Sequence, residues 1–206
     1  PEELRLLDVT EVDASWNPRM AEHRVYRYRL EGIEGWRCED EGRFQKHLDM
    51  FVGTYDARNF ARLEEGKDPV RTVLSMSPWV VGGRIVGFEM VGLAFLWNQV
   101  RRTAMALHGL EVGRLSVSEV RDALERPEKP ADFGVAPPEW LVLWDVVWSE
   151  LDHDHGQDEE RAWVAPPLHS AGGERTMRRR WSAGARAEVE AMLQHEWAIL
   201  GRLPSA

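Results

Sequence analysis

Hydrophobic and polar positions alternate most regularly between Arg24 and Leu30, which predicts a β-strand. Successive side chains of a strand point to opposite faces, so this register places Tyr26, Tyr28 and Leu30 on one face and Val25, Arg27 and Arg29 on the other. A looser alternation over Leu4–Val12 predicts an earlier strand, which the Asn17-Pro18-Arg19 turn would follow.

Two longer apolar stretches, Val70–Val81 and Arg84–Val91, are separated by Gly82-Gly83. A two-glycine connection between strand-like segments is a strong hairpin signal, because both central residues of the tight turn need a positive φ. Period-two spacing in the returning strand puts Val86, Phe88 and Met90 on one face.

Three helices are predicted between these strands and the last one. The first covers Glu39–Val52, buries Phe44, Leu48, Phe51 and Val52, and ends at Gly53 as a C-cap. The second covers Ala94–Gly113, where Leu96, Val100, Ala104 and Leu107 recur at helical spacing. The third starts at Ser116, with Glu119 completing a capping box, and is closed off by Pro127 and Pro130.

The segment Leu141–Trp148 is apolar almost throughout and is predicted as a central strand covered on both faces. The pattern as a whole predicts an α+β fold, an antiparallel sheet with helices packed on one face. We expect one domain over residues 1–148. Residues 149–206 would form an extension made of an acidic loop and a final amphipathic helix, Ala185–Leu203.

Composition is that of an ordinary globular protein, with 206 residues, 43% hydrophobic and 30% charged. No apolar run has the length of a membrane span, and the first residues carry no basic-then-apolar signal. The single cysteine, Cys38, excludes an internal disulfide, which suits the reducing cytoplasm where we expect the protein to act.

The net charge of −9 argues against a protein that is basic overall. Lysine occurs only at Lys46, Lys67 and Lys129, so nearly all cations are arginines. Salt adaptation and a high-GC genome would each produce this bias. A polyanionic partner would have to be bound by a local basic face.

Three strings, in order along the chain, resemble the TruA family of tRNA pseudouridine synthases. The first is Pro18-Arg19 followed by Arg24-Val25-Tyr26-Arg27-Tyr28. The second is Phe95-Leu96-Trp97-Asn98-Gln99-Val100-Arg101-Arg102, and the third is Ala136-Pro137-Pro138-Glu139-Trp140-Leu141-Val142-Leu143. The resemblance covers most of the chain up to Trp148 and does not extend to the last quarter.

This resemblance implies an isomerase that converts uridine to pseudouridine in the tRNA anticodon stem-loop without a cofactor or metal, and that acts as a homodimer. Arg101 matches the pocket arginine of the family, and Tyr26 matches its active-site tyrosine. Leu141 and Leu143 match the apolar wall of the same cavity. The other candidates for substrate binding are Arg19, Arg24, Arg27, Trp97, Asn98 and Arg102.

Two departures from the family pattern matter. The segment Gly-Arg-Thr-Asp-x-Gly-Val-His, which carries the catalytic aspartate of the family, does not occur between Pro1 and Ala206. We therefore expect an N-terminal domain outside these residues to supply the aspartate, and the 206 residues alone to be inactive. Trp97-Asn98 stands where the family often has histidines, which leaves the modified position open.

Other interpretations remain open on the sequence alone. Tyr26 and Tyr28 also fit ordinary packing of strand aromatics. The chain could be a non-catalytic relative that binds RNA or a protein partner. A metal-dependent hydrolase using His153 and His155 with their acidic neighbours is a weaker alternative. The run Arg178-Arg179-Arg180 could contact phosphate or pair with that acidic segment.

Overall fold

The computed structural model describes residues 10–149, 151 and 183–193. The chain divides into two compact units. One unit is Pro18–Asp152, and the other combines Pro1–Asn17 with His153–Ala206. In the latter unit, residues 183–193 are helical, in line with part of the predicted final helix, and residues 10–12 are not in a strand. The remainder of the predicted first strand, His153, His155 and Arg178–Arg180 lie outside the described residues.

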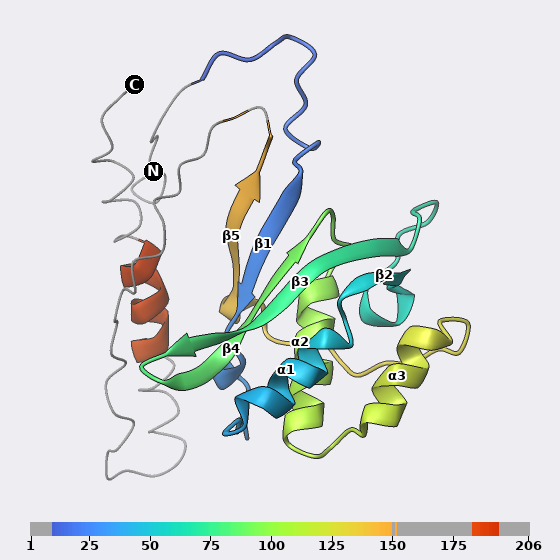
Figure 1. Cartoon of the computed structure of the whole chain (residues 1–206), viewed down its shortest axis with the longest axis vertical. Helices are drawn as coiled ribbons and strands as arrows, with labels where there is room; N and C mark the ends of the chain where they lie inside the picture. Colours follow the sequence, from blue (N-terminus) through green and yellow to red (C-terminus); the bar gives the residue numbers. More distant parts are fainter. Residues whose placement is uncertain (1–9, 150, 152–182, 194–206) are drawn as a thin grey trace. The chain divides into compact units, whose positions relative to one another are not determined.

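The unit Pro18–Asp152 is built on a five-stranded sheet with the strand order β2-β3-β4-β1-β5. All neighbouring strands are antiparallel (Figure 1). Helices join the sheet, so the predicted α+β class is confirmed. The strands are β1 (His23–Tyr28), β2 (Gly53–Asp56), β3 (Val70–Val81), β4 (Arg84–Gly92) and β5 (Leu141–Val147).

The hairpin between β3 and β4 forms at the predicted glycines. Gly82 and Gly83 have φ values of 55° and 74°, as a two-residue turn with two left-handed positions requires. Val86, Phe88 and Met90 are completely buried on one face of β4. On that same face, Tyr28 pairs with Phe88 across the strands, and their rings stack at 6.1 Å between centroids.

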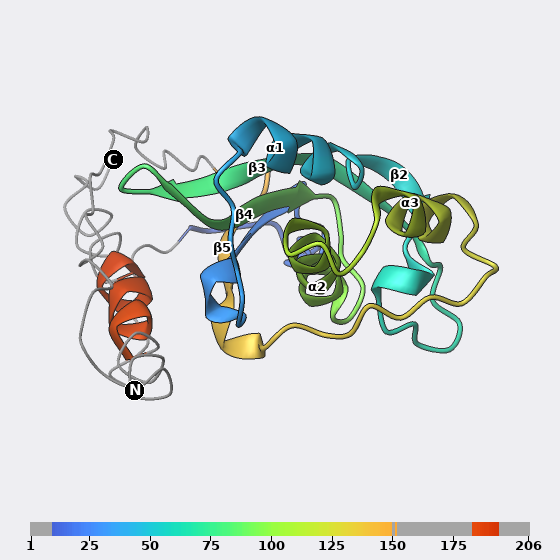
Figure 2. The same cartoon turned by 90° about the horizontal axis from the view of Figure 1, so that it is seen from below.

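Helix α1 (Glu41–Asp49) contacts β3, helix α2 (Gln99–Glu111) contacts β1, and the two helices contact each other. They cover the same face of the sheet (Figure 2). Helix α3 (Val117–Glu125) begins with the predicted capping box of Ser116 and Glu119. Short 3-10 turns complete the unit: η1 (Leu30–Gly32), η2 (Arg58–Phe60) and η3 (Pro138–Trp140).

Four features of the fold differ from the sequence-based expectations. Helix α2 begins at Gln99 rather than at Ala94, because Asn98 has a φ of 64° and interrupts a right-handed helix. Helix α1 ends at Asp49, so Val52 is 40% exposed instead of buried. Gly53, expected to cap that helix, has a φ of 121° and opens β2, a strand that was not predicted.

The fourth difference concerns β5. Among the described residues β5 pairs with β1 alone, so it is an edge strand and not a central one. Its side chains are mostly half-buried, and Leu143 is 49% exposed. A continuous apolar run predicted burial on both faces, but such a run does not report how many neighbours a strand has.

A buried carboxylate ties the two central helices together. The Glu111 side chain, at the end of α2, is fully buried. Its Oε2 accepts a hydrogen bond from Arg43 Nη2 at 2.8 Å, and its Oε1 lies 2.7 Å from His47 Nδ1. Arg43 and His47 both belong to α1. A buried carboxylate is tolerated only with such partners, so this group fixes how α1 packs on α2.

We predict that Glu111→Ala lowers the free energy of unfolding of the chain by about 1.5–3 kcal/mol, the range for hydrogen bonds that involve charged groups. Urea unfolding followed by circular dichroism measures this change. Glu125→Ala, at an exposed position of α3, is the matched control and should change the stability by less than about 0.5 kcal/mol. Equal stability of the two variants would contradict the proposed role of Glu111.

Candidate active site

The N-terminus of α2 holds Arg101 in a fixed position. Arg101 Nε donates to the carbonyl of Ala136 at 2.6 Å, and Arg101 Nη1 donates to Asn98 Oδ1 at 2.9 Å. The Ala136 backbone N–H donates in turn to the Arg101 carbonyl at 3.1 Å. Asn98 suits its left-handed conformation because its short polar side chain tolerates that region better than most residues do. The arginine is therefore oriented from two sides, by Asn98 and by Ala136.

The two tyrosines of β1 occupy different environments on one face of the strand. Tyr28 is fully buried, and its hydroxyl donates to the Pro137 carbonyl at 2.8 Å. Burial raises the pKa of Tyr28 well above its usual range, while the positive charge of Arg101 lowers it by a smaller amount. Tyr26 is half-buried, and burial raises its pKa as well. Of the two tyrosines, only Tyr26 is partly exposed.

The register of β5 brings the predicted apolar wall next to these tyrosines. Leu141 is the cross-strand partner of Tyr28, and Leu143 is the partner of Tyr26. Residues directly opposite each other in an antiparallel pair share a face of the sheet. Tyr26, Tyr28, Leu141 and Leu143 therefore lie together on one face, with α2 and Arg101 on that side of the sheet.

Other predicted binding residues have partners elsewhere. Arg27 lies on the opposite face of β1, where its Nε donates to Glu89 Oε2 at 2.8 Å and its guanidinium lies 3.8 Å from the centroid of the Trp144 ring. Arg102 donates to Asp132 Oδ1 at 2.8 Å, which ties α2 to the loop after α3. The structure does not bring these two side chains together with Tyr26.

The Arg24 side chain connects two loops by hydrogen bonds. Its guanidinium donates to the carbonyl of Leu93 and, at 2.8 Å, to the carbonyl of Arg19. Arg19 itself is exposed. Trp97, which directly precedes Asn98, is 53% exposed and has Arg62 stacked on it.

Several residues that shape this region were not among the predicted site residues. The Phe95 ring packs edge-on against Tyr26 at 5.1 Å between centroids. Gly92 makes room for Phe95, since a Cβ at this position would lie 2.7 Å from the ring. Ala136 and Pro137 supply the carbonyls that hold Arg101 and Tyr28. The sequence did contain one signal of the close approach of Phe95 to the backbone, because Gly92 is an isolated glycine at the end of an apolar strand.

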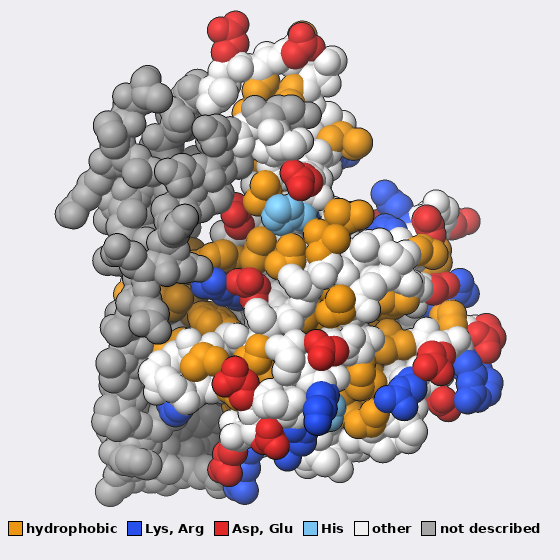
Figure 3. All heavy atoms as spheres, viewed as in Figure 1, with side chains coloured by type: hydrophobic (Ala, Val, Ile, Leu, Met, Phe, Trp, Pro, Cys, Tyr) orange, Lys and Arg blue, Asp and Glu red, His pale blue; other side chains and the backbone are white. Residues whose placement is uncertain are grey.

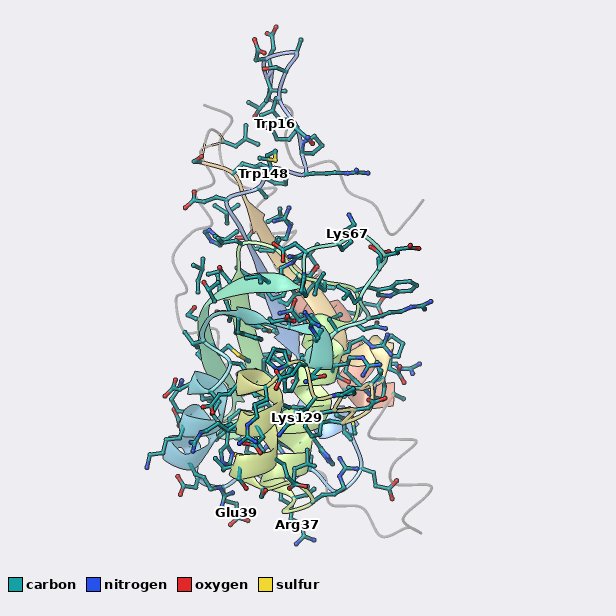
Figure 4. The ribbon with its side chains drawn as sticks, turned by 90° about the vertical axis from the view of Figure 1, so that its right-hand side faces the viewer. Trp16, Arg37, Glu39, Lys67, Lys129 and Trp148 are labelled. Carbon is teal, nitrogen blue, oxygen red and sulfur yellow. The ribbon has the colours of Figure 1, made fainter. Side chains whose placement is uncertain are left out.

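A surface hollow of about 460 Å³ lies elsewhere in the unit. It is formed around the β3–β4 turn and the segment after η1, and its lining includes Cys38 and Arg84 but none of the predicted site residues. Figure 4 shows two other lining residues, Arg37 and Glu39, at the opposite end of the unit from Trp148. Burial, followed by the negative charge of Glu111, raises the pKa of Cys38 to about 12, which favours the thiol over the thiolate at neutral pH.

On the face that Figure 3 shows, Lys and Arg side chains are interspersed with Asp and Glu side chains. The described part of this face therefore has no large patch of purely positive or purely negative charge. Within the described ranges, the side chains of His, Cys, Asp and Glu form no group that could hold a metal ion. In that same part of the chain, no helix combines the length and apolarity needed to cross a membrane.

Comparison with known proteins defines the class. Residues 48–149 match the family described as tRNA pseudouridine synthase. This match places residues 48–149 in a family of pseudouridine synthase domains, and the antiparallel α+β fold is consistent with that class.

Individual relatives identify the family more narrowly. Proteins called tRNA pseudouridine synthase A are 37% identical over 150 residues in Thermococcus sibiricus, 34% over 148 residues in Methanocorpusculum labreanum and 33% over 153 residues in Pyrococcus abyssi. The alignments cover 71%, 71% and 73% of this chain. They cover 53%, 50% and 56% of the relatives, so the chain spans about half their length. The chain belongs to the TruA family of tRNA pseudouridine synthases.

We predict that Tyr28→Phe changes how stability depends on alkaline pH. A raised pKa in the folded state means that the Tyr28 contribution is fully present below the unfolded pKa, about 10, and is lost as the pH rises above it. At pH 8 the variant should lose about 1 kcal/mol, because the hydrogen bond to Pro137 is removed. Between pH 9 and pH 11 its free energy of unfolding should fall less steeply than that of the wild type. Parallel curves over this range would contradict the assignment.

Proposed function

We propose that the Pro18–Asp152 unit provides one wall of the active site of an enzyme that isomerises uridine to pseudouridine in the anticodon stem-loop of tRNA. Its membership of the TruA family and the shared sheet face of Tyr26, Leu141 and Leu143 support this proposal. The catalytic aspartate of the proposed reaction comes from outside these 206 residues, because the sequence lacks the segment in which the family carries it.

The environment of Arg101 is the observation that carries the proposal. This half-buried guanidinium is held by the carbonyl of Ala136 and the amide oxygen of Asn98, both of them neutral. No carboxylate of the described part of the chain forms an ion pair with it. Arg27, Arg43 and Arg102, by contrast, all pair with a glutamate or aspartate. A positioned but uncompensated arginine is suited to receive a carboxylate through charge-assisted hydrogen bonds.

The reaction assigns separate tasks to the residues of this wall. It breaks the N-glycosidic bond, turns the base and forms a C–C bond, so the uridine has to leave its stack first. Arg101 orients the incoming aspartate and stabilises its charge. The partly exposed Tyr26 stacks its ring on the displaced pyrimidine, and its hydroxyl can donate or accept a proton. Leu143 contributes apolar surface that excludes water.

The proposed assembly is a homodimer whose two clefts grip tRNA. The net charge of −9 gives no general attraction for RNA, so binding depends on local arginines. Arg19, Arg24 and Arg102 stay candidates for RNA contact, and Arg27 would contact RNA only from the opposite face of the sheet.

We predict that Arg101→Ala, made in an enzyme that includes the aspartate segment, lowers the rate of uridine isomerisation at least about 100-fold and changes the Kd for tRNA less than about 3-fold. The reason is that preorganised electrostatic contacts act mainly in the transition state. Single-turnover tritium release and filter binding measure the two quantities. Arg121→Ala, on the exposed surface of α3, is the charge-matched control. A loss confined to affinity would refute the role of Arg101.

A second prediction concerns the 206 residues alone. They should bind an anticodon stem-loop RNA but produce no pseudouridine, whereas a protein that also carries the aspartate segment should be active. Nucleoside analysis by mass spectrometry detects the product. Turnover by the 206 residues would contradict the origin of the aspartate. If both proteins bind RNA and neither reacts, the non-catalytic RNA-binding alternative is favoured.

A further inference from the structure

Arg62 and Trp97 form an exposed cation–π pair that the reaction described above does not use. The guanidinium carbon of Arg62 lies 4.2 Å from the centroid of the Trp97 ring. Trp97 is nevertheless 53% exposed, and Arg62 is also exposed. A large aromatic ring with half its surface in water is a costly arrangement for a side chain that only supports the fold.

The backbone beneath this pair is fixed. The Arg62 backbone N–H donates to the Trp97 carbonyl at 2.8 Å, in an isolated antiparallel bridge. The preceding residue of each segment, Ala61 and Leu96, is buried in a small apolar cluster with Ala57. Alternation along the two short segments then turns Arg62 and Trp97 outward, so the pair is presented to solvent by a rigid base.

The pair is also linked to the candidate active site. Trp97 directly precedes Asn98, whose side chain accepts the hydrogen bond from Arg101. Phe95, on the other side of Leu96, packs on Tyr26. One short segment therefore carries the exposed Trp97 ring and also contacts both residues proposed to act on the uridine, Tyr26 through Phe95 and Arg101 through Asn98.

We infer that the Arg62–Trp97 pair stacks on an unpaired base of the substrate RNA that neighbours the modified uridine. This inference rests on the proposed function and adds Arg62 to its binding residues. Aromatic rings and arginine planes are the usual stacking partners of splayed-out bases. Lys67 lies in the same loop as Arg62 and is shown in Figure 4, but Glu64 and Glu65 offset its charge. Stacking, rather than net charge, is thus the chemistry that this surface offers.

The test uses the enzyme with its aspartate segment and a hairpin RNA with the sequence of the anticodon stem-loop. Trp97→Ala should weaken binding by about 5- to 150-fold, the loss expected for one stacked base. Trp97→Phe should recover most of it. Arg62→Ala should weaken binding by a smaller factor, with Arg121→Ala as the control. Thermal unfolding checks that each variant is folded.

Abasic hairpins locate the contact. One unpaired nucleotide at a time is replaced by an abasic residue, and the hairpin is bound to the wild type and to Trp97→Ala. At one position the two proteins should bind equally, because the stacking partner is gone. The inference would be overturned if Trp97→Ala weakened binding by the same factor on every hairpin, or if it did not weaken binding at all. The second result is also expected if this surface binds a protein instead of RNA. The outcome is separate from the proposed function, since stacking can be found in a protein that forms no pseudouridine.

Discussion

The arrangement of the candidate site depends on how Arg101 is anchored to the Ala136-Pro137 segment. Arg101 donates to the Ala136 carbonyl and accepts from the Ala136 N–H, and Tyr28 donates to the next carbonyl, that of Pro137. One extended segment thereby joins the start of α2 to the end of β1. The same segment leads through η3 into β5, which pairs with β1. The sheet face that bears Tyr26 and the guanidinium of Arg101 are therefore fixed relative to each other by the same few hydrogen bonds.

Sequence patterns predicted the parts of the fold that local chemistry determines. The Gly82-Gly83 turn, the Ser116 capping box and the alternation of β1 are each encoded within a few residues, and all three are present. The edge position of β5 depends on which strands find each other across the chain, which an apolar run does not specify. Likewise, the apolar spacing predicted that the central helix begins at Ala94. The helix begins at Gln99 because Asn98 has a left-handed backbone conformation.

The candidate site was predictable to the extent that it follows strand register and motif spacing. Tyr26, Leu141 and Leu143 share a face because period-two side chains and the β1–β5 pairing require it. The different environments of Tyr26 and Tyr28 were not predictable, because both occupy equivalent positions in the alternation. Through a tertiary approach, the Pro137 carbonyl accepts a hydrogen bond from the Tyr28 hydroxyl within the protein, whereas Tyr26 stays partly exposed. Phe95 and Gly92 were missed for a similar reason, since their contact is tertiary.

An acidic chain can still bind RNA if its arginines are used selectively. Arg27 and Arg43 pair with carboxylates of neighbouring elements of this unit, so most of their charge is compensated within the protein. Arg101 and Arg62 differ, because the contacts that position them are neutral: a carbonyl and an amide oxygen for Arg101, an indole ring for Arg62. Neutral partners orient a guanidinium without cancelling its charge. In the proposed function these two cations remain available, one for a carboxylate and the other for a nucleobase, although the net charge of −9 gives no general attraction for RNA.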